Sequence, residues 1–153
     1  MEKDLITRDY HKTVENLSDM VRENIKDIEI KMFNPALLAY IGDAVYELFV
    51  RTLLVSKGNS QAGETHKKAI SYVKAKSQAR LIEEIYESLT EEEKRIVKRG
   101  RNAKTGSMPK HAEIIEYKYA TGFECLLGYL YLNNHITRLF EILQYVVEIM
   151  KEE

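Results

Sequence analysis

Two acidic residues stand in otherwise apolar stretches of this sequence and are the first candidates for chemistry. Asp43 follows Gly42 in LLAYIGDAVYELFV, and Glu124 lies within ATGFECLLGYLYL. Ionised carboxylates are rarely buried unless they are paired or bound to a metal ion. Two carboxylates from facing helices could hold Mg²⁺ together with a substrate phosphate, and such an ion can activate water for phosphodiester cleavage. Because the two acids are far apart along the chain, they can meet only through the tertiary fold.

An ion-pair ladder is the simpler interpretation of the same acids. Glu47 and Arg51 lie four residues apart with the acid first, which is the favourable order for a pair on one helix face. Asp43 could join that ladder, and Glu124 could pair with a basic residue elsewhere. A pair of acids is a weak motif, so spacing alone favours ion pairs over a metal site.

Other residue types give weaker catalytic candidates. The histidines have no convincing nucleophile beside them in the sequence. Cys125 adjoins Glu124 and is better explained as a small core residue than as a nucleophile. As the single cysteine it excludes an internal disulfide, and no Cys/His cluster has the spacing of a zinc site.

Basic residues gather in two blocks, although the formal net charge is only −1. Segments 65–82 and 98–112 contain lysines and arginines but no acid. Such blocks indicate a positive surface on one side of the protein, which would suit a phosphate backbone. On charge alone, ordinary solvated helix faces and loops explain the two blocks equally well.

Helical periodicity dominates the chain, and with few prolines and glycines it predicts one all-α domain. Asn34 caps a helix that opens at Pro35, and Gly58 ends it. Thr90 and Glu93 form a capping box for a later helix. The expected helices cover about residues 9–30, 35–57, 75–88, 90–99 and 110–132, with others from near 64 and from 137, and a basic loop at 100–109.

The compartment can also be predicted from the sequence. The N-terminus MEKDLITRDY is charged where a signal peptide would be apolar, and the longest apolar run is broken by charges. With one cysteine, the chain suits a reducing environment. We therefore expect a cytoplasmic protein.

The motifs in order resemble a known family. YIGDAVYE resembles the ribonuclease III signature, and TGFECLLGYLYL resembles the second acidic motif of that family. THKKA, KAKSQA and KRGRNAK, the last followed by PK, are similar to Mini-III, the short bacterial branch of the family. Each motif alone is weak, but the ordered set from Asn34 to about Leu143 is specific.

The resemblance implies an all-helical ribonuclease III domain that forms a homodimer and cleaves double-stranded RNA with Mg²⁺. Asp43 matches the catalytic aspartate and Glu124 the metal-binding glutamate, so both are expected to be catalytic and to bind metal. Two further family acids are replaced by Ala39 and Thr121. A non-catalytic RNA-binding relative and a helical interaction protein therefore stay open as alternatives.

The Mini-III branch has no separate double-stranded-RNA-binding domain, and none is expected here. We therefore expect the catalytic domain itself to bind RNA. A-form RNA is recognised mostly through its shape, phosphates and 2′-hydroxyls, which suits basic loops. The residues expected to contact RNA are Lys67, Lys68, Lys74, Lys76, Ser77, Gln78, Arg99, Arg101, Asn102, Lys104 and Lys110.

The resemblance also implies an interface and a substrate, and it leaves the segment before Asn34 unexplained. Tyr40 matches the aromatic residue that inserts into the partner subunit in the family, although an ordinary core tyrosine is the alternative. Residues 1–33 are expected to form a helical extension and residues 34–153 the catalytic domain. The family branch implies the large-subunit (23S) ribosomal RNA precursor as substrate, with a ribosomal protein as helper.

Overall fold

The computed structural model describes residues 12, 15–17, 19–20, 29–56, 58, 62–103 and 111–151. Within these residues all regular structure is helical, with no β-strand, which confirms the all-α prediction. None of the described helices is long and apolar enough to cross a membrane. The elements are η1 (Ile30–Met32), α2 (Pro35–Ser56), α3 (Ala62–Val73), α4 (Ala75–Ile85), η2 (Tyr86–Ser88), α5 (Glu91–Asn102), α6 (His111–Leu132) and α7 (Ile136–Lys151).

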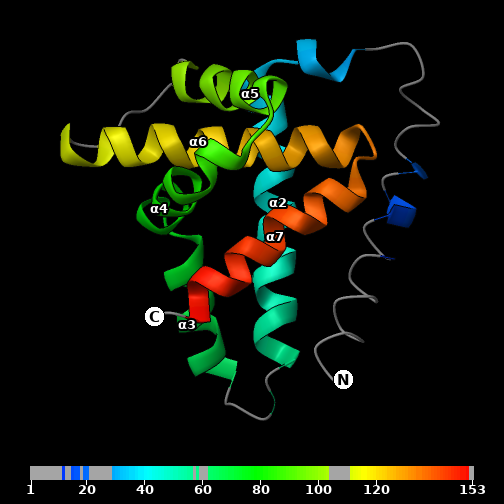
Figure 1. Ribbon diagram of the computed structural model, residues 1–153. Coiled ribbons are helices and arrows are strands. Elements are labelled where there is room, and N and C mark those ends of the chain that lie inside the picture. Colours follow the sequence, from blue (N-terminus) through cyan, green and yellow to red (C-terminus); the bar gives the residue numbers. More distant parts are fainter. Residues whose placement is uncertain are drawn as a thin grey trace.

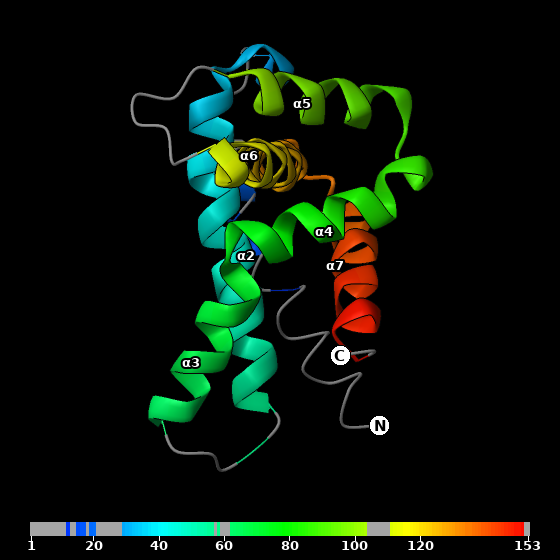
Figure 2. The ribbon, with the colours of Figure 1, turned by 90° about the vertical axis from the view of Figure 1, so that its left-hand side faces the viewer.

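Helix α6 runs through the centre of the molecule. In Figure 1 it lies between α5 above and α4 below, and α2 crosses it. Figure 2, which looks along α6, shows the same three helices around it. From Ala120 to Leu132, every described side chain of α6 is buried except the half-buried Glu124. A helix that is apolar on all sides must be covered on all sides, and this explains why α6 becomes the core.

Two glycines allow α2 and α6 to approach very closely. A Cβ added to Gly42 would overlap the carbonyl oxygen of Glu124 and would lie 2.6 Å from its carbonyl carbon. A Cβ added to Gly128 would likewise overlap the carbonyl oxygen of Leu38. The space beside Gly42 is thus occupied by the backbone of the facing helix. The crossing point of the two helices is fixed by main-chain contact on both sides.

The predicted ends of α2 are confirmed. The Asn34 Oδ1 accepts a hydrogen bond from the backbone N–H of Ala36 at 2.9 Å, so Asn34 caps a helix that begins at Pro35. The helix ends at Ser56, and Gly58 adopts a φ of +105°, which glycine tolerates without strain.

Helix α5 begins as predicted but ends later. Thr90 and Glu93 form the reciprocal capping box. The expected loop from residue 100 is wrong at its start, because α5 continues to Asn102. Gly100 is buried in the helix: a Cβ there would lie 2.8 Å from the Cα of Gly122 on α6. Gly100 therefore serves close helix packing and does not terminate the helix.

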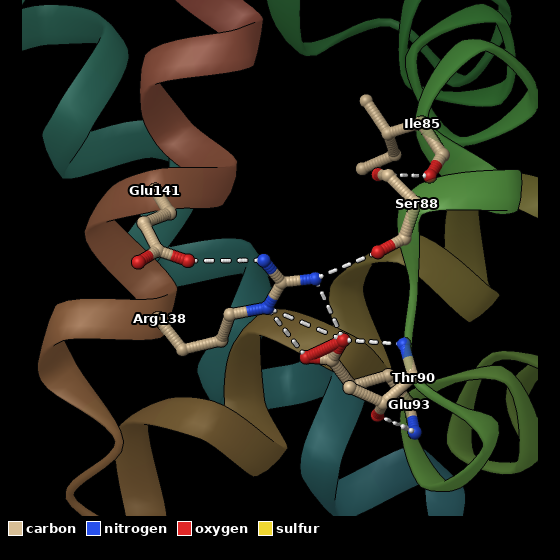
Figure 3. A network of polar contacts seen from close by, with 6 residues as sticks. All are labelled: Ile85, Ser88, Thr90, Glu93, Arg138 and Glu141. Atoms are coloured by element: carbon tan, nitrogen blue, oxygen red, sulfur yellow. Dashed lines mark hydrogen bonds and ion pairs between the residues drawn. The ribbon is translucent and has the colours of Figure 1, made fainter.

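An ion pair ties α5 to α7, and Figure 3 shows its surroundings. Arg138 Nε and Nη2 each donate to the Glu93 carboxylate at 2.9 Å, and Nη2 also donates to the Ser88 carbonyl at 3.1 Å. Burial alone would raise the pKa of Glu93, but hydrogen bonds from Arg138 and Thr90 reverse this and lower it. The sequence indicated the capping role of Glu93 and gave no sign of this second partner.

The predicted N-terminal helix lies mostly outside the described residues. Residues 12, 15–17 and 19–20 are helical. The expected end at Ile30 is wrong, because Glu29 is extended and Ile30 opens the short helix η1. The Asn134 side chain donates to Asp19 Oδ1 at 2.8 Å, so this segment contacts the turn between α6 and α7.

Candidate active site

Asp43 and Glu124 are brought together where α2 crosses α6. Gly42, the neighbour of Asp43, packs on the main chain of Glu124 itself. Asp43 is exposed, and Glu124 is half-buried. The charge of Asp43 acts on Glu124 strongly enough to raise the pKa of the glutamate. The tertiary meeting that the sequence required of the two acids therefore occurs.

The pKa values of both carboxylates are raised, because the two groups are partly desolvated and lie near other negative charges. Burial and then the charges of Asp43 and Glu47 raise the pKa of Glu124 to about 7, although a hydrogen bond from the Gln78 side chain opposes them. Partial desolvation, followed by the charge of Glu47, raises the pKa of Asp43. Asp43 thus disfavours the ionised form of Glu124, and Glu47 disfavours that of Asp43. A cation between Asp43 and Glu124 would reverse this effect.

The alternative of an ion-pair ladder holds only in part. Glu47 and Arg51 do pair, with their charged atoms 3.7 Å apart, and both side chains are largely exposed. In the described part of the chain, the ladder does not continue to Asp43, and Glu124 has no ion pair. The two acids thus stand apart from the surface pair beside them.

A cavity of about 270 Å³ opens beside Glu124. Ala39 and Thr121, the two positions where the resemblance expects further acids, both line it. The short side chains at these positions leave room that longer carboxylates would fill. The remaining lining residues are Ala36, Val73, Ala75, Gln78, Tyr117 and Glu124.

The donor set fits a hydrated Mg²⁺ ion. Among the described residues, no group of three or more His, Cys, Asp or Glu side chains is placed to hold a metal ion. Mg²⁺ is commonly held by one or two carboxylates, keeps several waters and takes further oxygens from substrate phosphates. Asp43 and Glu124 supply the carboxylates, and the cavity beside Glu124 has room for the waters.

The first basic block lies on α3 and at the start of α4. Lys67, Lys68, Lys74 and Lys76 are all exposed, in keeping with the expected RNA contacts. Ser77 is half-buried and donates to the carbonyl of Ser71 at 2.9 Å.

Gln78 does not belong to this surface, and its assignment as an RNA contact is corrected. Its side chain is only 1% exposed, because it turns inward from α4. It donates to the Val73 carbonyl at 2.9 Å and offers a hydrogen bond to Glu124. The run of basic residues placed Gln78 on the RNA surface. Its position among the apolar residues of α4, beside Ala79 and one turn from Ile82, could have indicated that it faces inward.

The second basic block is divided. Arg99 is half-buried, and its guanidinium donates to the carbonyls of Lys31 and Phe33, just before α2. Its expected contact with RNA stays a prediction. The guanidinium carbon Cζ of Arg101 lies 5.8 Å from the centroid of the Tyr119 ring, in a cation–π contact. Asn102 is exposed. The other two expected contacts, Lys104 and Lys110, lie outside the described residues.

Tyr40 is 80% exposed, so the alternative of a core tyrosine is wrong. It belongs to an apolar strip on one face of α2. The other large apolar members are also exposed: Leu37, Leu48 and Val55. Their positions repeat at helical spacing, so the strip runs along most of the helix.

Comparison with known proteins gives consistent similarities. Residues 36–135 match the ribonuclease III domain family. The chain is 45% identical over 139 residues to Mini-ribonuclease 3 of Thermoanaerobacter sp. (strain X514), covering 91% of this chain and 94% of that protein. It is 48% identical over 125 residues to Mini-ribonuclease 3 of Clostridium tetani (strain Massachusetts / E88), covering 81% and 83%. A crystal structure of a Fusobacterium nucleatum protein has a TM-score of 0.70 at 31% identity, covering 76% of this chain and 93% of that one.

Proposed function

The chain belongs to the ribonuclease III family, in its Mini-ribonuclease 3 branch, and on that premise we propose that it is an endoribonuclease that hydrolyses double-stranded RNA. The observation that carries the proposal is the meeting of Asp43 and Glu124 at the α2–α6 crossing, inside the matched domain. Two mutually repelling carboxylates beside a cavity are a typical arrangement for metal-assisted phosphodiester hydrolysis.

Family nucleases generally use a divalent metal ion, and we propose Mg²⁺ here, held by Asp43 and Glu124. When bound, Mg²⁺ supplies Lewis acidity and activated water. Asp43, on the exposed side, meets the phosphate that approaches from solvent. Glu124 lies on the buried helix α6 and supplies the metal ligand on the inner side of the site. Close backbone packing at Gly42 holds together the two backbone segments that carry these carboxylates.

The RNA contacts proposed for the catalytic domain come from exposed basic and polar side chains. Lys67, Lys68, Lys74 and Lys76 follow one another on α3 and α4, and α4 also packs on α6, which carries Glu124. Ser77, Arg101 and Asn102 extend the surface, and Lys104 and Lys110 stay predictions. Contacts of this kind bind the phosphate backbone without reading bases.

We propose a homodimer that uses the exposed apolar strip of α2, which includes Tyr40 near its N-terminal end. One active site cuts one strand, and a two-fold axis would place a second site across the duplex. The strip supports this because exposed apolar residues that align on one helix face usually have a partner.

The substrate and the place of action follow the branch. We propose that the enzyme matures the ends of the 23S ribosomal RNA precursor in the cytoplasm, with a ribosomal protein as helper. The proposed catalytic domain covers residues 34–153, with a helical extension at 1–33. The ribonuclease III match at residues 36–135 falls inside the proposed domain.

The decisive test is cleavage of a long RNA duplex by the purified protein with Mg²⁺, alongside the Asp43→Asn variant. We expect the unaltered chain to cut the duplex and the variant to bind it without cutting. Binding without cleavage by both proteins would favour the alternative of a non-catalytic relative. That alternative stays open because Ala39 and Thr121 replace two acids of the family. Equal cleavage by both proteins would exclude Asp43 from the chemistry.

A further inference from the structure

Gln78 is the most completely buried polar side chain in the described core, with an exposure of 1%. It lies on α4, and its side chain lines the same cavity as Glu124. An amide buried to this degree costs free energy unless its donors and its acceptor are satisfied. Its hydrogen-bond partners therefore need an explanation.

The donors of the Gln78 amide have partners on two other elements. Nε2 donates to the carbonyl of Val73 at 2.9 Å, at the end of α3 where the chain bends into α4. The amide also offers a hydrogen bond to the Glu124 carboxylate on α6. One side chain thus connects the α3–α4 bend, which carries basic residues, to the acid proposed to bind metal.

The acceptor oxygen of the same amide, unlike its donor nitrogen, lacks a described hydrogen-bond partner. Gln78 Oε1 is buried and has no hydrogen-bond partner among the described residues. The cavity that Gln78 lines measures about 270 Å³, and Glu124 and Thr121 give it further polar atoms. A polar cavity of this size can hold several waters, each of which needs about two to four polar partners.

We propose that Gln78 is a positioning residue for Glu124, whose amide orients the carboxylate toward Asp43 and whose Oε1 accepts a hydrogen bond from cavity water. This inference rests on the proposed function and adds a residue to it. Asp43 and Glu124 leave most of the coordination of a Mg²⁺ ion to water, and Gln78 anchors one such water. Outer-shell partners of this kind fix the orientation of a ligand and tune its metal.

The test compares Gln78→Met with Leu81→Met, using Mn²⁺ alone as the probe and no RNA. Methionine keeps the volume of glutamine but removes its donors and acceptor. Leu81 is a buried residue of the same helix that does not line the cavity, so it controls for disturbed packing of α4. We expect Gln78→Met to bind Mn²⁺ about 10- to 100-fold more weakly by calorimetric titration. Leu81→Met should bind it as the unaltered chain does.

Unchanged Mn²⁺ affinity in Gln78→Met would overturn the proposal. If that variant does not fold, Gln78→Glu replaces it, because it keeps the shape and adds a third carboxylate beside Glu124. The thermal midpoint of Gln78→Glu should fall without metal, and Mn²⁺ should then raise it more than it raises that of the unaltered chain. An equal or smaller Mn²⁺ shift would contradict a role at the metal site.

The duplex-cleavage assay separates the two claims. If the unaltered chain neither cuts a duplex nor binds Mn²⁺, the proposed function fails. If the unaltered chain cuts and Gln78→Met keeps its Mn²⁺ affinity, only the role of Gln78 fails. If both claims hold, Gln78→Met should need more Mg²⁺ for half-maximal cleavage while its affinity for RNA stays the same.

Discussion

Gly42 packs directly on the main-chain carbonyl of Glu124, so the residue beside one proposed metal ligand touches the backbone of the other. This contact sets where α2 crosses α6 and therefore the backbone positions from which the Asp43 and Glu124 side chains project. The geometry of the proposed active site thus depends on the absence of a side chain at position 42.

Gly42→Ala should therefore push α2 and α6 apart. The added Cβ meets backbone atoms, which cannot move aside as a flexible side chain could. We expect a loss of about 1–3 kcal/mol in the free energy of unfolding, as for other overpacked cores, and a loss of cleavage that exceeds the unfolded fraction. Urea unfolding and duplex cleavage measure the two effects.

Gly63→Ala is the matched control, because a Cβ at this position on α3 meets nothing within 4 Å. Alanine at position 63 should therefore leave the helix crossing and the cleavage unchanged. Equal effects of the two substitutions on cleavage would show that the crossing does not set the site.

Glu124→Gln should stabilise the protein in the absence of divalent metal while abolishing cleavage. Burial and the charge of Asp43 hold the pKa of Glu124 at about 7, so its ionised form is unfavourable until a cation binds. An amide of the same shape removes that repulsion. We expect a higher thermal midpoint than the unaltered chain in chelator at pH 8, and a smaller rise when Mn²⁺ is added. A lower midpoint in chelator would mean that the carboxylate has a stabilising partner.

Arg138→Leu should be among the most destabilising single changes. It leaves the Glu93 carboxylate, whose side chain is 5% exposed, without its bidentate partner. Removing one member of a buried pair costs about 3–5 kcal/mol. Glu141→Gln is the control, because the Glu141 side chain is 53% exposed and its contact with Arg138 is worth less than about 1 kcal/mol. Urea unfolding at pH 7 distinguishes them.

The same pair predicts a dependence on pH. The pKa of Glu93 is lowered in the folded protein, so its folded form binds fewer protons than the unfolded chain near the ordinary value of 4.5. Its stabilising contribution is therefore complete above that pH and is lost as pH falls through the lower folded value. Unfolding curves between pH 7 and pH 3 should show a loss that Arg138→Leu lacks.

Lys68→Met and Arg99→Met should separate RNA binding from folding. Lys68 is exposed on α3, so its loss should weaken duplex binding and reduce the salt dependence of the affinity by about one unit, without changing stability. Arg99 holds two backbone carbonyls before α2, so its loss should lower the thermal midpoint first. Binding measured from low to high salt, with melting curves, checks both. An unchanged salt slope in Lys68→Met would remove it from the RNA surface.

Tyr40→Glu should produce monomers. Its side chain is 80% exposed on α2, so the substitution disturbs no core packing and acts on a partner surface alone. Tyr145→Glu on α7, where the tyrosine is 42% exposed, serves as the control. Sedimentation velocity should show a dimer for the unaltered chain and the control. If the unaltered chain is a monomer, the proposed interface is excluded.

The sequence predicted well those features that depend on neighbours within a turn or two. The cap at Asn34, the stop at Gly58 and the capping box of Thr90 and Glu93 are local hydrogen-bond patterns, and all three are confirmed. The i,i+4 pair of Glu47 and Arg51 is of the same kind. Similarly, the ordered motifs indicated the ribonuclease III family without any tertiary information.

The sequence failed where a side chain has its partner on another helix. Gln78 was grouped with surface residues because its sequence neighbours are basic, yet it is buried and lines a cavity with Glu124. The sequence also gave no sign of the two backbone carbonyls that Arg99 binds before α2. Gly100 suggested a loop, but it is a contact point with α6. In each case the deciding partner is distant along the chain.

By itself, then, the sequence determined the all-α class, the capped starts at Asn34 and Thr90 and the family, because periodicity and capping are set by residues close along the chain. Only the tertiary structure decided that Asp43 and Glu124 lie close enough to interact, that Gly42 brings their helices into backbone contact, and that Gln78 faces inward. The physical reason is that burial and electrostatic coupling depend on distances between elements, and side-chain packing across helices alone fixes those distances.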